Sequence, residues 1–157
     1  MTGIPEAVAQ AIRAHAEEAY PAECCGLLLA DGAGGLRFLP IANVAGTAQA
    51  AGVSTRSAAD GYVMDPLGLM AAQDEADRLG ASVWAIVHSH PDVGAYFSAE
   101  DRRNALDDRG REPLWPGVHY LVISARAGGV DRACLYTWDP GARDFTEEEV
   151  PGFSRLS

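Results

Sequence analysis

Two stretches of the chain space their apolar residues at intervals of three and four, as amphipathic helices do. The first covers residues 5–19 and the second covers residues 66–79. Proline lies at the first turn of each, where its missing N–H is tolerated, and Gly80 is a typical residue to end the second. A shorter helix is expected over residues 102–108, where mixed charges are typical of a solvated face.

Short apolar runs bounded by turn residues predict the strands. Their expected ranges are 23–30, 36–41, 62–64, 83–88, 118–124, 130–138 and, as a charged edge strand, 145–150. Glycine-rich turns join the first two strands, and also 118–124 to 130–138, so each pair should form a hairpin. The order strand, helix, strand over residues 62–88 indicates a crossover unit in a mixed sheet. Helices and strands of this kind predict an α/β fold.

Residues 43–61 have no apolar period and are rich in Ala, Gly, Ser and Thr, so they are expected to form a long loop. Residues 109–117 are expected to form a second loop. A chain of 157 residues suits one domain, assigned here to residues 1–150, with 151–157 as a frayed C-terminal tail.

Composition narrows the class of protein. The net charge of −10 argues against nucleic-acid binding, which needs a basic surface. No apolar run is long enough to span a membrane, and the N-terminus lacks the pattern of a secretory signal. Three cysteines, two of them adjacent, do not make a disulfide framework. A cytoplasmic protein is therefore expected.

Two histidines follow the apolar run over residues 83–87 in the sequence His88-Ser89-His90-Pro91. Because side chains alternate along a strand, His88 and His90 point the same way and can bind one ion together. Pro91 has no N–H to donate and should end the strand's pairing.

Asp101 offers this pair a carboxylate. Two neutral imidazoles and one carboxylate suit a catalytic zinc, which keeps its fourth position for water and lowers the pKa of that water from about 15.7 to about 7. Ser98 and Asp101 also have the spacing of a helix N-cap with an acid three residues later. The structural and the metal-binding interpretations are compatible.

His88-x-His90-Pro91, six residues, then Ser98-x-x-Asp101 resembles the signature of the JAMM (MPN+) metalloproteases. The family usually has proline directly before the serine, where this chain has Phe97. The resemblance implies a single JAMM/MPN domain, with a mixed, curved sheet flanked by helices and similar to the cytidine deaminase fold. It also implies one zinc ion per chain, held by His88, His90 and Asp101.

A glutamate far upstream completes the family pattern. Pro21-Ala22-Glu23-Cys24-Cys25-Gly26-Leu27-Leu28 is similar to the segment that carries it. The resemblance makes Glu23 the general base, which takes a proton from the attacking water and passes it to the leaving amine. It makes Ser98 a hydrogen-bond donor to the oxyanion. Without the resemblance, Glu23 would be interpreted as a solvated residue at a strand edge.

The family's activity implies hydrolysis of a peptide or isopeptide bond after the C-terminal Gly-Gly of a ubiquitin-like protein. Small bacterial members often process sulfur carriers, so the expected substrate is a carrier from which cysteine or another C-terminal group is released. Isopeptide-linked ubiquitin-like conjugates are the alternative substrate. Part of residues 43–61 is expected to border the substrate channel.

Three other classes compete with this interpretation. A Cys-His hydrolase would use Cys24 or Cys25 and lose activity to a thiol alkylator. A zinc deaminase would need a Pro-Cys-x-x-Cys pattern, which the sequence lacks. A non-catalytic MPN scaffold keeps the fold but normally lacks the metal ligands that are present here.

Overall fold

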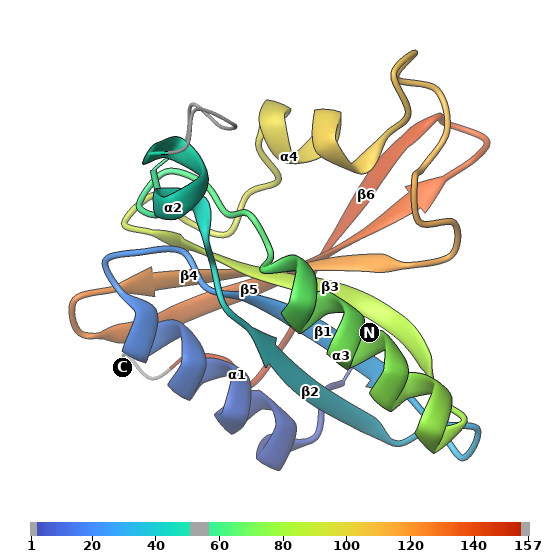
Figure 1. Ribbon diagram of the computed structural model, residues 1–157, viewed down its shortest axis with the longest axis horizontal. Coiled ribbons are helices and arrows are strands. Elements are labelled where there is room, and N and C mark those ends of the chain that lie inside the picture. The colour runs from blue at the N-terminus through green and yellow to red at the C-terminus, as the bar shows by residue number, and fades with distance from the viewer. Residues whose placement is uncertain (1–2, 51–56, 155–157) are drawn as a thin grey trace.

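Six strands form one mixed sheet in the computed structural model, which describes residues 3–50 and 57–154 (Figure 1). Their spatial order is β2-β1-β3-β4-β5-β6, and all neighbours are antiparallel except β3 and β4, which run parallel. The bounds of the strands are β1 Cys25–Ala30, β2 Leu36–Ile41, β3 Ser82–Pro91, β4 His119–Arg126, β5 Gly129–Asp139 and β6 Asp144–Glu149.

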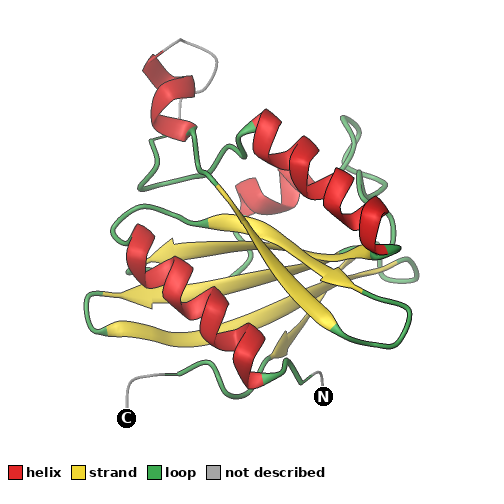
Figure 2. Cartoon of the chain, turned by 60° about the horizontal axis from the view of Figure 1, so that its bottom comes forward, coloured by secondary structure: helices red, strands yellow, loops and turns green. Residues whose placement is uncertain are grey.

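The helices cover both faces of the sheet (Figure 2). They are α1 Glu6–Ala19, α2 Ala45–Ala50, α3 Pro66–Leu79 and α4 Ala99–Ala105. Helix α1 packs on one face through its buried apolar stripe, and α3 and α4 contribute to the core on the other face. The α/β class and the mixed sheet flanked by helices are confirmed. None of the helices in the described part of the chain is long and apolar enough to cross a membrane.

Strand residues alternate between the two cores. In β3, Ala85 and Val87 belong to the core under α1, whereas Ile86 belongs to the core under α3. Continuing this alternation places His88 and His90 on the same face as Ile86. The two histidines therefore lie on the face that α3 and α4 cover.

The predicted pairings hold. Strands β1 and β2 form one hairpin and β4 and β5 another, while β6 lies at an edge of the sheet. Strand β1 is antiparallel to both β2 and β3, so β2 and β3 run in the same direction with β1 between them. Helix α3 lies on the crossover from β2 to β3 and covers residues 66–79 as predicted, with Asp65 accepting a hydrogen bond from the Leu67 N–H and Gly80 in the left-handed conformation.

The strand predicted over residues 62–64 is wrong. Only Met64 pairs there, in a single bridge to Asn43. The N–H of Val63 bonds to the side-chain oxygen of Asn43, 3.0 Å away, so it is not free for a ladder. The backbone of this segment is held by the side chain of Asn43 instead of by a neighbouring strand.

The loop predicted over residues 43–61 contains the short helix α2. The side chain of Asn43 accepts the Ala45 N–H at 3.0 Å, which satisfies a donor at the start of the helix, and alanine favours the helical backbone. Residues 51–56 of the predicted loop lie outside the described residues.

Two predictions for the C-terminal half of the chain differ from the structure, one for a helix and one for the tail. The helix expected over residues 102–108 is α4, which follows its N-cap Ser98 and covers Ala99–Ala105, so it begins and ends three residues earlier than predicted. The tail expected to fray is anchored at Phe153, which is 1% exposed within the core under α1. The Gly152 carbonyl also accepts a hydrogen bond of 2.7 Å from Arg13. Residues 155–157 of the predicted tail lie outside the described residues.

Candidate metal centre

Four titratable side chains converge where β3 ends and β1 begins. Glu23, His88, His90 and Asp101 are 6%, 0%, 5% and 8% exposed. Such burial is unusual for acids and requires that their charge be compensated by partners. The sequence predicted each of these residues as part of one site, and the structure brings all four together.

His88, His90 and Asp101 form a triangle of facing atoms. The two Nε2 atoms of the histidines lie 3.2 Å apart. Oδ2 of Asp101 lies 3.2 Å from Nε2 of His88 and 3.1 Å from Nε2 of His90. Ligands at about 2.0–2.2 Å from a tetrahedral zinc lie roughly 3.3–3.6 Å from one another. The triangle is within a few tenths of an ångström of that spacing, so these residues fit a metal ion.

The helix α4 delivers Asp101 to the triangle. Ser98 is its N-cap: Ser98 Oγ accepts the Asp101 N–H at 2.9 Å, and Oδ2 of Asp101 accepts the Ser98 N–H at 3.0 Å. This reciprocal pair is a capping box, and it fixes the aspartate side chain by local hydrogen bonds. Asp101 is therefore both part of the helix cap and a candidate metal ligand, two roles that the sequence analysis found compatible.

His90 is oriented by its other ring nitrogen. Nδ1 lies 3.2 Å from the carbonyl oxygen of Gly94, an acceptor, so the ring proton belongs on Nδ1. In the neutral ring, the form that binds a metal, the lone pair of Nε2 then faces His88 and Asp101. Backbone carbonyls orient metal-binding histidines in this way.

Asp101 and His90 shift each other's protonation in the metal-free site. Burial alone would raise the pKa of Asp101, but the hydrogen bonds from His88 and His90 outweigh it and hold that pKa below its usual value. Burial lowers the pKa of His90, but Asp101 outweighs it and raises that pKa above its usual value. Asp101 is therefore an anion at neutral pH, as a metal ligand must be.

Glu23 lies two residues before β1, beside the end of β3. A carboxylate oxygen of Glu23 and nitrogens of His88 and His90 all lie within 4.8 Å of one another, so these three residues also form a set that could hold a metal ion. Two hydrogen bonds join the two segments, from the Cys24 N–H to the side-chain Oγ of Ser89 at 2.7 Å and from the Ser89 N–H to the Cys24 carbonyl at 3.1 Å. They fix the segment of Glu23 against the strand of the two histidines.

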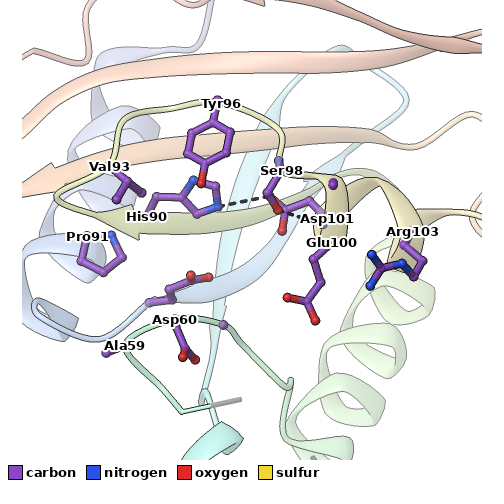
Figure 3. A pocket seen from close by; sticks show the side chains of 13 residues that line it. Ala59, Asp60, His90, Pro91, Val93, Tyr96, Ser98, Glu100, Asp101 and Arg103 are labelled. Carbon is purple, nitrogen blue, oxygen red and sulfur yellow. Dashed lines mark hydrogen bonds and ion pairs between the residues drawn. The ribbon is translucent and has the colours of Figure 1, made fainter. Parts of the chain in front are cut away.

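A cleft of about 530 Å³ opens onto His90 and Asp101. Figure 3 shows His90, Tyr96, Ser98 and Asp101 together along one side of it, with Asp60 on a separate segment of chain. Glu23 also lines the cleft. The candidate centre is therefore buried but open to a ligand from one direction.

The wall of the cleft formed by residues 92–98 is held from behind by aromatic packing. The ring of Phe97 lies 5.0 Å from that of Tyr136 and 4.9 Å from that of Phe145. The hydroxyl of Tyr136 donates a hydrogen bond of 2.7 Å to the Ala95 carbonyl. The residue that departs from the family pattern thus ties the cleft to β5 and β6.

The two cysteines near Glu23 do not suit a nucleophilic role. Cys24 and Cys25 are buried. Burial raises the pKa of the Cys24 thiol to about 11 and that of Cys25 to about 12. A nucleophilic cysteine needs a lowered pKa, so the structure argues against a Cys-His hydrolase.

Sequence reasoning missed two residues beside the centre. The ring of Tyr62 is stacked on that of His88, with centroids 4.8 Å apart and planes inclined by 25°. Asn43 bonds the carbonyl of Glu23 at 2.9 Å. Neither belongs to a motif with His88 or Glu23, and an asparagine two residues after a predicted strand is an ordinary turn signal.

A buried group of two imidazoles and two carboxylates at the end of a strand is the kind of centre that metal-dependent α/β proteins build. The model of the prokaryotic homologues of the JAB domain matches residues 5–136, so the chain belongs to this family. The JAB/MPN family includes metalloisopeptidases. The family resemblance seen in the sequence is confirmed. No protein of curated function matches the chain.

Two of the solved structures that are similar to this chain share its fold. Protein DSY2949 from Desulfitobacterium hafniense is 26% identical with a TM-score of 0.69, and the match covers 96% of this chain and 91% of that one. A protein from Salinibacter ruber is 26% identical with a TM-score of 0.61, over 99% and 95% of the two chains. AF2198, a JAB1/MPN domain protein from Archaeoglobus fulgidus, is 19% identical with a TM-score of 0.46, over 96% and 98%.

Proposed function

We propose that the protein is a zinc-dependent peptidase that hydrolyses the bond after the C-terminal Gly-Gly of a ubiquitin-like protein. The substrate proposed first is a ubiquitin-like sulfur carrier. The observation that carries the proposal is the convergence of Glu23, His88, His90 and Asp101 beside an open cleft, which all of them except His88 line. Membership in the JAB family supports it. The free cysteines agree with a cytoplasmic location.

In this proposal His88, His90 and Asp101 hold one zinc ion. Zinc bound there would supply an acidified water and polarise the scissile carbonyl. Glu23 is assigned as general base instead of ligand because the other three residues already form the closest triangle. Its carboxylate takes the proton of the attacking water and passes it to the leaving amine.

Ser98 is assigned as the hydrogen-bond donor to the carbonyl oxygen that gains charge. Its cap bond to the Asp101 N–H uses a lone pair of Oγ. A hydroxyl that accepts one hydrogen bond still has its proton to donate. The two roles of Ser98 are therefore compatible.

Replacing Ser98 with alanine should lower kcat by about 100-fold, the loss expected for one oxyanion donor. Loss of the cap should also cost about 1 kcal/mol of stability. Steady-state kinetics and thermal melting measure the two effects separately. A variant that melts lower but keeps its full kcat would show that Ser98 is a helix cap alone.

The substrate proposal is tested by mass spectrometry of a ubiquitin-like sulfur carrier that bears cysteine after its C-terminal Gly-Gly. Incubation with the protein should remove the cysteine, a zinc chelator should stop the reaction, and added zinc should restore it. Cleavage that a chelator does not affect would contradict the metal dependence. An intact carrier after incubation with zinc-loaded protein would contradict the carrier assignment, and isopeptide-linked conjugates would be tried next.

A further inference from the structure

The side chain of Asn43 makes four hydrogen bonds, as many as an amide's two N–H groups and two lone pairs allow. Nδ2 donates to the carbonyl oxygens of Glu23 at 2.9 Å and Gly61 at 3.1 Å. Oδ1 accepts the N–H groups of Ala45 and Val63, both at 3.0 Å. One half-buried side chain thus joins three segments that are distant in the sequence.

One of these bonds fixes the backbone of Glu23. Its carbonyl is held by Asn43, and its N–H donates to the carbonyl of Ala58 at 2.7 Å. Both main-chain groups of the candidate base are therefore held by the chain that follows β2. The direction of the Glu23 side chain depends on these bonds, because its Cα lies between them.

Two further bonds fix Tyr62. Asn43 holds the carbonyl of Gly61 and the N–H of Val63, the residues on either side of the tyrosine. The Tyr62 ring is the one stacked on His88. Asn43 therefore anchors the backbone on both sides of the residue that packs against a candidate ligand.

We propose that Asn43 is a positioning residue of the centre, which sets the Glu23 carboxylate and the Tyr62 ring relative to His88. Asn43 does not itself line the cleft. It acts through the backbone of Glu23 and of residues 61–63, to which its side chain is hydrogen-bonded. Its effect on turnover rests on the proposed function, whereas its effect on the geometry around His88 does not.

The amide is the group that this position requires. Aspartate has the same shape, but it lacks both N–H donors and would place a carboxylate oxygen against the carbonyls of Glu23 and Gly61. Asn43→Asp should therefore loosen these two segments while Oδ1 can still accept from Ala45 and Val63. Asn43→Ser, which keeps one small hydroxyl, is a second variant with no added charge.

The kinetic test compares Asn43→Asp and Asn43→Ser with the wild type on the carrier substrate. The matched control is Asn104→Asp, the same change at the other asparagine of the chain, which is exposed on α4. Displacing a positioned group costs roughly 10–100-fold in activity. We expect kcat to fall by that factor in both Asn43 variants, with KM within about twofold and zinc content unchanged, and no change in Asn104→Asp.

The second readout is the NMR spectrum of the His88 ring, which does not depend on activity. The stacked Tyr62 ring shifts the ring protons of His88, so loosening Tyr62 should move these signals toward their positions in a Tyr62→Leu reference. Asn104→Asp should leave them in place.

The outcomes separate this inference from the proposed function. Folded Asn43 variants with unchanged His88 signals and unchanged kcat overturn the inference. A lowered melting temperature does not rescue it if the His88 signals and kcat are those of the wild type. If the wild type cleaves no Gly-Gly substrate, the proposed function fails and the NMR comparison alone decides the role of Asn43.

Discussion

Glu23→Gln should lower kcat by a factor between 10² and 10⁴, the usual contribution of a general base. Glutamine has almost the same volume and fits the same buried place, but it does not accept a proton at neutral pH. KM should change little, because the substrate cleft keeps its shape. Zinc content should remain at one ion per chain, because the triangle of His88, His90 and Asp101 is intact.

Zinc content measured beside kcat tells the two possible roles of Glu23 apart. As one of the three residues whose ligand atoms lie within 4.8 Å, Glu23 could instead bind the metal directly. In that case Glu23→Gln would lose zinc together with activity. Glu18→Gln, the same change at an exposed position of α1, is the matched control and should behave as wild type. Full activity of Glu23→Gln would contradict the assignment of the base.

Asp101→Asn should weaken zinc binding by more than about 100-fold and abolish turnover at limiting zinc. Even partners that only orient a ligand are worth 10–100-fold in metal affinity, and Asp101 is assigned as a ligand itself. Oδ2 faces both imidazoles, at 3.1 and 3.2 Å, and an amide removes the negative charge from this position. A competitive zinc chelator measures the affinity.

Asparagine at position 101 can still accept the Ser98 N–H through its side-chain oxygen, so α4 should keep its cap. Circular dichroism should therefore show a folded variant. Asp108→Asn, an exposed change beyond α4, controls for the loss of one negative charge from an acidic protein. Wild-type zinc affinity in Asp101→Asn would exclude Asp101 from the ligand set.

Strand alternation made the centre predictable from the sequence. Two histidines two residues apart at the end of a buried strand must share a face, and the cap spacing placed Asp101 after a short loop. Glu23 was predictable only through the family pattern, because no local rule joins it to His88. The pairing of Cys25 with His88 supplies that link in three dimensions.

Side-chain contacts with residues that are distant in the sequence account for the predictions that were wrong. Asn43 replaces a strand at residues 62–64 with side-chain hydrogen bonds and starts α2 within an expected loop. Phe153 anchors a tail whose composition gives no sign of burial. Such contacts join residues far apart in the sequence, and neither periodicity nor turn chemistry encodes them.

Phe97 ties the cleft wall to residues that are synthesised after it. A proline at this position would restrict the backbone as soon as it was made. A phenylalanine restrains it through packing on Tyr120, Tyr136 and Phe145, which leave the ribosome later. All four converging residues precede these partners in the sequence. The nascent chain therefore carries every group of the centre before it has the strands that hold the cleft wall.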